Sequence, residues 1–505
     1  AGTAWFDDCS VRRYQGALLE SLTTSLYRGL ATGGRGRVHA GMNLQDYDYA
    51  PADVQTTLTV RSSDGEVVRT VQPDTRTLSE LTFSFGTERL PLGEYDLVIE
   101  ARTRDGALSG ELTGQMRRTD EVPEYHAYID EHQRLIVDGE PFFPLGTYWN
   151  KLPEYETSLA EKHLDIYADS AFNCIMPYDS WNIDEAQLDA CEERGISVLF
   201  SVKDFYAGRH GLKTSEDAHE EITKYVERFR DHPAIIAWYT NDEMPTSMYD
   251  QLRAHQLWME ELDPTRPTWV VTYRMRELPD YLGTFDVIGT DPYPIPHRTV
   301  SLALRYTRET VGDTLGLKPV WMVPQIFNWA SARPDEAEKF RPPTLPEMRS
   351  MAWQCITGGA NGLVFYSWMG LWKVKELGLE SFEDRWPEVK QMAAEIERFE
   401  PLLLSVEPAM RPRHVNAPET VGWRVYGQDG RTFLVVVNAD RKPAKATFEF
   451  PRAIADHEVL FRHPRVTADG VKVEVRLESL EPTIIALTPG DGADGWGRWQ
   501  ERWGR

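Results

Sequence analysis

The chain has 505 residues, of which 41% are hydrophobic, with 16 tryptophans and a formal net charge of -24. This length exceeds one ordinary hydrophobic core, so several domains are expected. The charge argues against nucleic acid as a partner, because phosphates require a basic surface. No apolar run reaches the roughly 20 residues that a membrane-spanning helix needs.

Four cysteines, at positions 9, 174, 191 and 355, are too few and too scattered for a disulfide framework or a metal site. We therefore expect no metal and no other cofactor, and we expect Cys174 and Cys355 to be core thiols. The chain begins Ala1-Gly2-Thr3 without methionine, so we expect a secreted or periplasmic protein whose signal peptide has been removed. The sequence carries no signal for an oligomeric state.

Residues 1–125 are expected to form a β-sandwich. Residues 54–61 alternate between apolar and polar side chains, residues 62–65 supply a turn, and the alternation then resumes. Residues 95–101 repeat the pattern, which is typical of a sandwich. Residues 4–11 resemble the last strand of a carbohydrate-binding β-sandwich, which implies the end of a preceding carbohydrate-binding module.

Residues 134–402 change to strands that alternate with amphipathic helical stretches, after a small hairpin at residues 136–141. The number and spacing of the strands predict a (β/α)8 TIM barrel. A doubly wound open sheet is the rival fold, but no glycine-rich phosphate turn follows any strand. The expected strands are residues 142–149, 172–178, 196–203, 234–241, 268–273, 287–291, 320–325 and 362–368.

Beyond the barrel, strands return without helices. We expect residues 403–490 to form a small C-terminal β-domain that braces the barrel. Residues 491–505 form a tail with three tryptophans among glycines and charged residues, and no element is predicted there. The predicted fold is thus an α/β barrel flanked by an N-terminal β-sandwich and a C-terminal β-domain.

The most informative stretch is residues 231–245, an apolar run that ends in the adjacent acids Asp242 and Glu243 and is stopped by Pro245. Two neighbouring carboxylates at the carboxyl end of a buried strand repel each other, which indicates a functional site. The alternative is that Asp242 caps the next helix and Glu243 lies in its first turn. Both acids can reach one ligand only if the strand stops near Thr240 and the backbone turns, because strand side chains alternate.

Other candidates lie at the carboxyl ends of the expected strands, where a TIM barrel builds its active site. Carboxylates and aromatic rings without a Cys/His metal set favour a sugar site with acid/base chemistry, so the expected partner is a glycan. The expected substrate-binding residues are Trp149, Tyr178, Asn241, Asp291, Tyr293, Gln325, Trp329, Tyr366 and Trp368.

Within this set the three tryptophans are predicted to form a wall that stacks on sugar rings, although any one of them alone is more often a core residue. Two neighbouring groups are given structural roles. Lys203 and Asp204 are expected to form a surface salt bridge, and His232 is expected to be a structural hydrogen-bonding residue at the start of the fourth strand.

Two segments carry a resemblance to a known family. Residues 231–238, Asp-His-Pro-Ala-Ile-Ile-Ala-Trp, and residues 138–146 are similar to the segments that lead into the fourth and first strands of clan A glycoside hydrolases. In that clan the fourth strand ends Asn-Glu, whose Glu is the acid/base, and the seventh strand ends in a nucleophilic Glu. Here the fourth strand ends Asn241-Asp242-Glu243, and the seventh offers Gln325.

The pair Asp242-Glu243 resembles the adjacent Asp-Glu of glycoside hydrolase family 123 and related β-N-acetylgalactosaminidases, in which the substrate's 2-acetamido oxygen replaces the enzyme nucleophile. This resemblance implies that Asp242 holds the acetamido nitrogen and that Glu243 is general acid and then base. Tyr293 is the candidate for the acetamido oxygen, with Tyr366 second. The expected activity is exo-acting, on terminal β-N-acetylhexosaminides.

Two alternatives remain open. One is a clan A β-glycosidase for unacetylated sugars, in which Glu243 is the acid/base and the nucleophile lies elsewhere or was changed to Gln325, naturally or by engineering. The other is a non-catalytic carbohydrate-binding protein that has kept the barrel.

Overall fold

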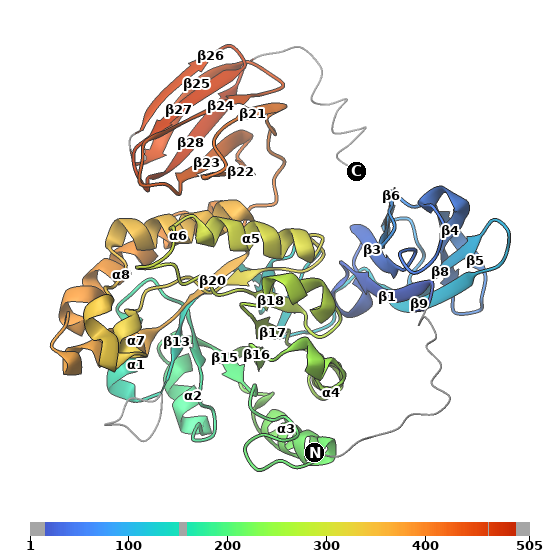
Figure 1. The fold of residues 1–505 in the computed structure, drawn as a ribbon, viewed down its shortest axis with the longest axis horizontal. Helices are drawn as coiled ribbons and strands as arrows, with labels where there is room; N and C mark the ends of the chain where they lie inside the picture. The colour runs from blue at the N-terminus through green and yellow to red at the C-terminus, as the bar shows by residue number, and fades with distance from the viewer. Residues whose placement is uncertain (1–15, 151–158, 463, 491–505) are drawn as a thin grey trace, which may run out of the picture. The chain divides into compact units, whose positions relative to one another are not determined.

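The computed structural model describes residues 16–150, 159–462 and 464–490. The chain divides into two compact units, residues 1–123 and 124–505, and each is described by itself (Figure 1). The expected strand at residues 4–11 and the tail at residues 491–505 lie outside the described residues. Among the described residues, none of the helices is long and apolar enough to cross a membrane.

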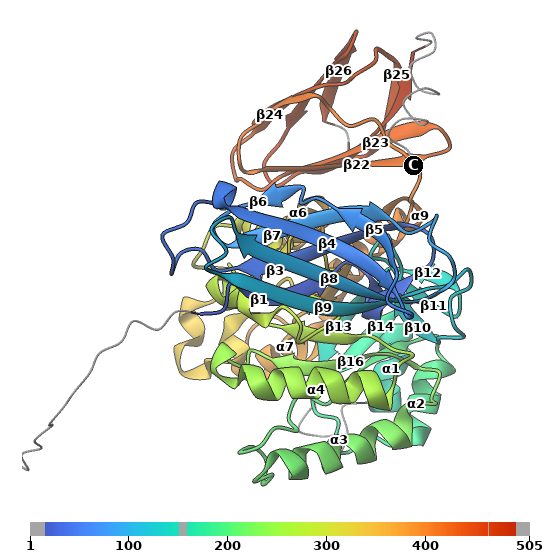
Figure 2. The ribbon, with the colours of Figure 1, turned by 90° about the vertical axis from the view of Figure 1, so that its right-hand side faces the viewer.

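The N-terminal unit is a β-sandwich, whose strands are the blue arrows of Figure 2. Side chains that alternate between buried and exposed along β7 and β8 place one face of each sheet on a shared core that includes Leu58, Phe83 and Leu97. One sheet has the order β1 (Leu19–Thr24), β3 (Arg35–Met42), β7 (Glu80–Gly86) and β6 (Thr75–Arg76). The other has the order β2 (Leu30–Ala31), β9 (Ser109–Arg118), β8 (Gly93–Thr103), β4 (Val54–Ser62) and β5 (Val67–Val71).

A small antiparallel sheet opens the second unit, followed by a parallel sheet of eight strands within the described residues. The small sheet consists of β10 (Ala127–Ile129), β11 (Leu135–Val137) and β12 (Glu140–Phe142), which confirms the predicted hairpin. The barrel strands are β13 (Leu145–Trp149), β14 (Cys174–Pro177), β15 (Ser197–Ser201), β16 (Ile235–Asp242), β17 (Thr268–Val271), β18 (Val287–Gly289), β19 (Trp321–Met322) and β20 (Gly362–Phe365).

The parallel sheet closes into a barrel. Its order runs from β18 back to β13 and then through β20 to β19, and a parallel bridge between Ile288 and Val320 joins the two ends. The strands lie within the predicted ranges, except that β16 extends one residue further, to Asp242, so the TIM barrel is confirmed. The α-helices of this unit are α1 (Glu161–Ala168), α2 (Glu185–Glu192), α3 (Ser215–Phe229), α4 (Tyr249–Leu262), α5 (Leu302–Asp313), α6 (Leu345–Gly358), α7 (Trp368–Lys373), α8 (Phe382–Glu397) and α9 (Glu400–Leu403).

The crossover between β17 and β18 differs from the others around it. It carries the 3-10 helix η4 (Met275–Tyr281), which contains Pro279, in place of an α-helix. Proline lacks the backbone N–H that a longer α-helix would use, so this crossover is short. The other 3-10 helices of the chain are η1 (Tyr27–Gly29), η2 (Pro51–Asp53), η3 (Thr246–Met248), η5 (Trp329–Ser331), η6 (Pro334–Lys339) and η7 (Val374–Leu377).

The C-terminal β-domain, orange to red in Figure 1, is a second sandwich, which packs on α6. Residues Glu347 to Thr357 of α6 are all buried, and Ser350 donates a hydrogen bond to the Asn438 carbonyl oxygen at 3.2 Å. A Cβ atom at Gly422 would lie 2.3 Å from Thr357 Oγ1, so glycine permits this approach. The strands are β21 (His414–Asn416), β24 (Ala444–Glu449), β27 (Lys472–Leu477) and β26 (Arg465–Asp469) in one sheet, and β22 (Val421–Gln428), β23 (Arg431–Asn438), β28 (Pro482–Pro489) and β25 (Ile454–Phe461) in the other.

Candidate active site

Asp242 ends strand β16 at the carboxyl edge of the barrel, and Glu243 follows it. The pairing of β16 with β17 shifts register between Tyr239 and Asn241, so a bulge at Thr240 brings Asp242 back to the same side as Tyr239. Glu243 then has a φ of 56°, in the left-handed region that residues other than glycine rarely adopt. The sequence suggested that the strand must stop near Thr240, but β16 continues to Asp242. The bulge at Thr240 and the left-handed conformation of Glu243 turn the backbone instead.

The carboxylate of Asp242 is held by two tyrosines. Tyr239 donates to Oδ1 at 2.6 Å, and Tyr178 donates a short hydrogen bond to Oδ2. Tyr148 in turn donates to the Tyr239 hydroxyl at 3.2 Å. These bonds fix the orientation of a carboxylate that still has free lone pairs for a ligand. The tyrosines therefore preorganise Asp242 as an acceptor.

The helix-cap alternative for Asp242 and Glu243 is wrong. The next helical element, η3, has Pro245 at its N-cap, and α4 has Met248 there. Neither start receives a side-chain capping hydrogen bond. The two acids therefore do not serve the termini that follow them.

Lys203 packs against the ring of Tyr178, one of the two tyrosines that hold Asp242. Its Nζ lies 3.7 Å from the centre of the Tyr178 ring and 2.8 Å from Asp204 Oδ2. The expected salt bridge with Asp204 is present, but it is not on the surface, because only 5% of the Lys203 side chain and 13% of the Asp204 side chain are exposed. A desolvated cation against an aromatic face is a stronger contact than an exposed one.

Asp291, just beyond β18, brings a third carboxyl group to the site. Burial, and then repulsion from Glu243, raises the pKa of Asp291 well above its ordinary value. Burial also raises the pKa of Glu243, with repulsion from Asp242 adding to the effect, while a hydrogen bond with Asp291 and the charge of Arg274 oppose it. Because two ionised carboxylates repel each other, the interaction with Glu243 favours the protonated form of Asp291.

The contact between Glu243 and Asp291 limits what these two acids can do together. Retaining glycosidases place their two catalytic carboxyl groups about 5 to 5.5 Å apart, and inverting enzymes place them farther apart. Carboxyl groups that share a hydrogen bond are closer than either arrangement. Asp291 is thus positioned as a partner of Glu243, not as an opposing nucleophile.

Gln325, at the end of the seventh strand, is fully buried and bonded to backbone. Its Oε1 accepts from the Ile295 N–H at 2.9 Å, and its Nε2 donates to the carbonyl oxygens of Ile295 at 2.9 Å and Phe327 at 3.1 Å. One acceptor and two donors are thus used, a combination that an amide supplies and a carboxylate does not. Gln325 holds the segment after Asp291 and Tyr293 in place.

Tyr293 and Tyr366 face the carboxyl groups. Their ring centres lie 5.5 Å apart, and neither hydroxyl has a hydrogen-bond partner among the described residues. Burial, and then the charges of Asp242, Glu243 and Asp291, raises the pKa of Tyr366 to about 12. The Tyr366 hydroxyl is therefore within electrostatic range of all three acids and is available to a ligand. Burial and the charge of Asp291 likewise raise the pKa of Tyr293 well above its ordinary value.

The predicted tryptophan wall needs correction. Trp149 is 0% exposed and Trp368 is 1% exposed, and their rings stack on each other 4.9 Å apart. Rings packed in this way have no free face for a sugar, so both belong to the core. Trp329 is partly exposed and lies 6.1 Å from the Tyr293 ring, so its contact with substrate stays a prediction.

The remaining predictions concern backbone shape. Asn241 is buried and accepts a hydrogen bond from the Met244 N–H at 2.9 Å, so its side chain shapes the turn after the acids.

Two predictions of structural residues are confirmed. His232 accepts a hydrogen bond from the Ala234 N–H and contacts Asp189, which confirms its structural role. Cys174 and Cys355 are free and buried, as predicted. Tyr239 was not predicted as a site residue, because regular alternation places it on the face opposite Asp242.

Comparison with known proteins gives one family match. Residues 181–295 match the model described as "Glycosyl hydrolases family 2, TIM barrel domain". The matched segment contains Asp242, Glu243 and Asp291 and ends at Ile295, before the seventh strand. No curated protein sequence matches the chain.

Solved structures show low similarity to this chain. A β-glucuronidase from an uncultured Clostridium species is 12% identical with a TM-score of 0.37, covering 69% of this chain and 61% of its own. A β-D-glucuronidase from Dictyoglomus thermophilum is 14% identical with a TM-score of 0.37, covering 69% and 62%. A cyclomaltodextrinase is 12% identical with a TM-score of 0.49, covering 93% and 100%. The chain therefore spans less than two thirds of either glucuronidase. Through residues 181–295 it is similar to the glycosyl hydrolase family 2 barrel, which supports a glycosidase.

Proposed function

We propose that this protein is an exo-acting retaining glycosidase that cleaves terminal β-N-acetylhexosaminides, with N-acetylgalactosaminides favoured, by substrate assistance. The acetamido oxygen of the substrate attacks the anomeric carbon, and the bond to the leaving oxygen breaks as Glu243 protonates it. Asp242 accepts a hydrogen bond from the acetamido N–H and stabilises the positive charge of the oxazolinium ring. Glu243 then takes a proton from the water that opens this ring.

One observation carries the proposal: two consecutive acids face one site. Asp242 and Glu243 both act on the Tyr366 hydroxyl, and Asp242 is oriented by Tyr178 and Tyr239. An oriented acceptor next to a carboxyl group with a raised pKa is the pair that an acetamido N–H and a leaving oxygen require. A raised pKa favours the protonated form that a general acid needs.

The hydroxyl of Tyr293 is proposed to bind the acetamido oxygen. This hydroxyl has no partner among the described residues, and its ring is fixed edge-on against Phe327 at 5.2 Å. A donor that does not need to be reoriented stabilises the developing charge best. Tyr366 is the second candidate for this role.

A glycosidase for unacetylated sugars is the second candidate function, favoured by the match to the family 2 barrel. It requires a carboxylate nucleophile across the site from Glu243. The matched segment ends at Ile295, which lies 30 residues before Gln325. Because backbone groups use the Gln325 amide completely, Gln325 acts in this mechanism as a structural residue and not as a replaced nucleophile.

The test compares 4-nitrophenyl β-glycosides of N-acetylgalactosamine, N-acetylglucosamine, galactose and glucuronic acid. We expect hydrolysis of the N-acetylated substrates with retention of configuration, and inhibition by a thiazoline analogue of the oxazolinium ring. Cleavage of only the unacetylated substrates would refute substrate assistance. Calorimetric binding of the sugars without hydrolysis of any glycoside would instead support a carbohydrate-binding protein.

A further inference from the structure

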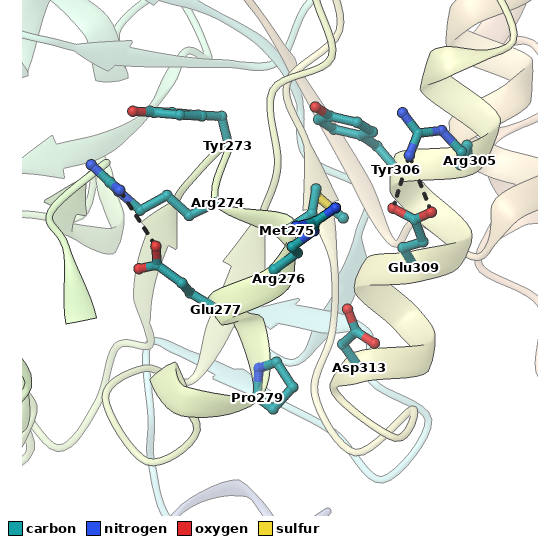
Figure 3. A pocket seen from close by; sticks show the side chains of 10 residues that line it. All are labelled: Tyr273, Arg274, Met275, Arg276, Glu277, Pro279, Arg305, Tyr306, Glu309 and Asp313. Carbon is teal, nitrogen blue, oxygen red and sulfur yellow. Dashed lines mark hydrogen bonds and ion pairs between the residues drawn. The ribbon is translucent and has the colours of Figure 1, made fainter.

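A cavity of about 780 Å³ lies beside the barrel between the segment that contains η4 and helix α5 (Figure 3). It occurs at the crossover that carries a 3-10 helix in place of an α-helix. Its size is within the range of small-molecule sites, about 300 to 1,000 Å³. The short crossover therefore leaves room that a full helix would fill.

Three arginines and three acids, Glu277, Glu309 and Asp313, line this cavity in a chain whose net charge is -24. Arg274 and Arg276 come from the η4 side, and Arg305 comes from α5 (Figure 3). The ion pairs of Arg274 with Glu277 at 3.5 Å and of Arg305 with Glu309 at 3.3 Å are long, and Arg276 forms no ion pair with a described residue. The Nε of Arg274 is buried without a hydrogen-bond partner in the described part of the chain. Guanidinium donors therefore remain available to an anion.

Two tyrosines add flat apolar surface to the same cavity. The Tyr273 side chain is 48% exposed, and the Arg274 guanidinium lies 5.1 Å from its ring centre. Arg305 lies 5.3 Å from the ring centre of Tyr306 on the opposite wall. Aromatic faces beside planar cations are suited to a sugar ring that carries an acidic group.

One residue that lines the cavity, Arg274, acts electrostatically on Glu243 and lowers its pKa. Glu277, which pairs with Arg274, also accepts a hydrogen bond from Thr246 Oγ1 at 3.0 Å, and Thr246 follows Glu243 by three residues. A general acid protonates the leaving oxygen, so the groups next to Glu243 lie on the leaving-group side of the cleaved bond.

We propose that this cavity binds an anionic group, a uronate carboxylate or a sulfate ester, on the leaving-group sugar of the substrate. The inference rests on the proposed function for the position of the cleaved bond. The protein then selects acidic glycans in which a neutral terminal N-acetylhexosamine precedes a charged residue. In this proposal the anionic group is bound by Arg274, Arg276 and Arg305. The sugar ring packs against Tyr273 and Tyr306.

The experiment compares disaccharides that differ only in the group at C6 of the leaving-group sugar. N-acetylgalactosamine is β-linked, in 1,3 and 1,4 linkage, to glucose, glucuronic acid or glucose 6-sulfate, and kcat/KM is measured at low and high salt. We expect at least one anionic disaccharide to exceed the glucose disaccharide by about tenfold at low salt, with the ratio shrinking at high salt. The glucuronate and sulfate arms show which anion is bound.

The variants Arg276→Gln and Arg305→Gln are expected to reduce the anionic-to-neutral ratio at least fivefold. Arg228→Gln is the matched control, because it removes the same charge from an exposed arginine of α3, which pairs with Glu185 of α2 at 2.7 Å and does not line the cavity. The control should keep the ratio. Ratios within twofold of one for both anions, or an equal ratio in all three variants and the wild type, would overturn the proposal.

Failure of the proposed function gives a different result. If no N-acetylhexosaminide is cleaved, binding of methyl β-glucuronide and of glucose 6-sulfate is measured by calorimetry against methyl β-glucoside. Binding of an anionic probe that Arg276→Gln and Arg305→Gln weaken, and Arg228→Gln does not, supports the anion site. Absence of binding to either anionic probe overturns it.

Discussion

Replacing Gln325 by glutamate separates the two candidate functions. The wild-type amide accepts one hydrogen bond and donates two, to the carbonyl oxygens of Ile295 and Phe327. A neutral glutamic acid keeps the acceptor and one donor, so one buried carbonyl loses its partner, at a cost of about 1 to 3 kcal/mol. An ionised glutamate loses both donors, which costs about 2 to 6 kcal/mol before the burial of its charge is added.

The cost of Gln325→Glu should therefore depend on pH. Burial raises the pKa of the introduced carboxyl above its unfolded value, so its protonated form is the compatible one and stability is lost as pH rises. We expect the unfolding temperature of the variant to fall, relative to wild type, between about pH 5 and pH 8. Gln325→Met is the control, because it loses all three hydrogen bonds without gaining an ionisable group and should be destabilised equally at both pH values.

Activity of the same variant provides the refutation. Calorimetric unfolding is paired with hydrolysis of 4-nitrophenyl β-galactoside and β-glucuronide. We expect no gain on either substrate, because the added carboxylate faces backbone carbonyls. A variant that is as stable as wild type at pH 8 and cleaves an unacetylated glycoside would show that Gln325 occupies a nucleophile position.

Four further substitutions test the site. Asp242→Asn should slow hydrolysis of an aryl β-N-acetylgalactosaminide by about 100- to 1,000-fold, because an amide N–H would oppose the acetamido N–H; a rate near wild type would remove Asp242 from the mechanism. Glu243→Gln should abolish cleavage of disaccharides yet raise the free energy of unfolding by about 1 kcal/mol, as it removes a charge beside two other acids; an active or less stable variant would contradict this. Asp291→Asn should flatten the loss of thermal stability between about pH 4 and pH 8, since the raised pKa of Asp291 makes its protonated form the stabilising one, and an unchanged slope would refute that assignment. Tyr293→Phe should lower kcat/KM for N-acetylated substrates by about 100-fold, and little effect would transfer the role to Tyr366.

The barrel could be predicted because its strands are buried on both faces. Residues such as Ile235, Ile236 and Trp238 leave continuous apolar runs, and the length between runs implies crossovers. The short fifth crossover was less visible, since Pro279 ends a helix but does not say what fills the space beside it. Element positions thus followed from local pattern, while the cavity depended on packing.

The site was predicted only in part, for reasons that are also physical. Alternation along a strand predicts which residues share a face, but the bulge at Thr240 depends on pairing with β17 and reverses that prediction for Asp242. Trp149 ends β13 and Trp368 begins α7 just after β20, where a side chain can point to the core or to the rim, and their mutual stacking joins residues far apart in sequence. Gln325 stood out by residue type, yet its backbone contacts required the loop at Ile295.

The burial of α6 limits how the domains of this protein can be exchanged during evolution. Every side chain from Glu347 to Thr357 is enclosed, and the face that packs on the C-terminal sandwich meets it at Gly422 without space for a methyl group. A helix that is buried on all sides has no water-facing surface of its own. The sandwich therefore completes the barrel's core and is not an exchangeable module, so recombination that replaced it would have to replace α6 as well.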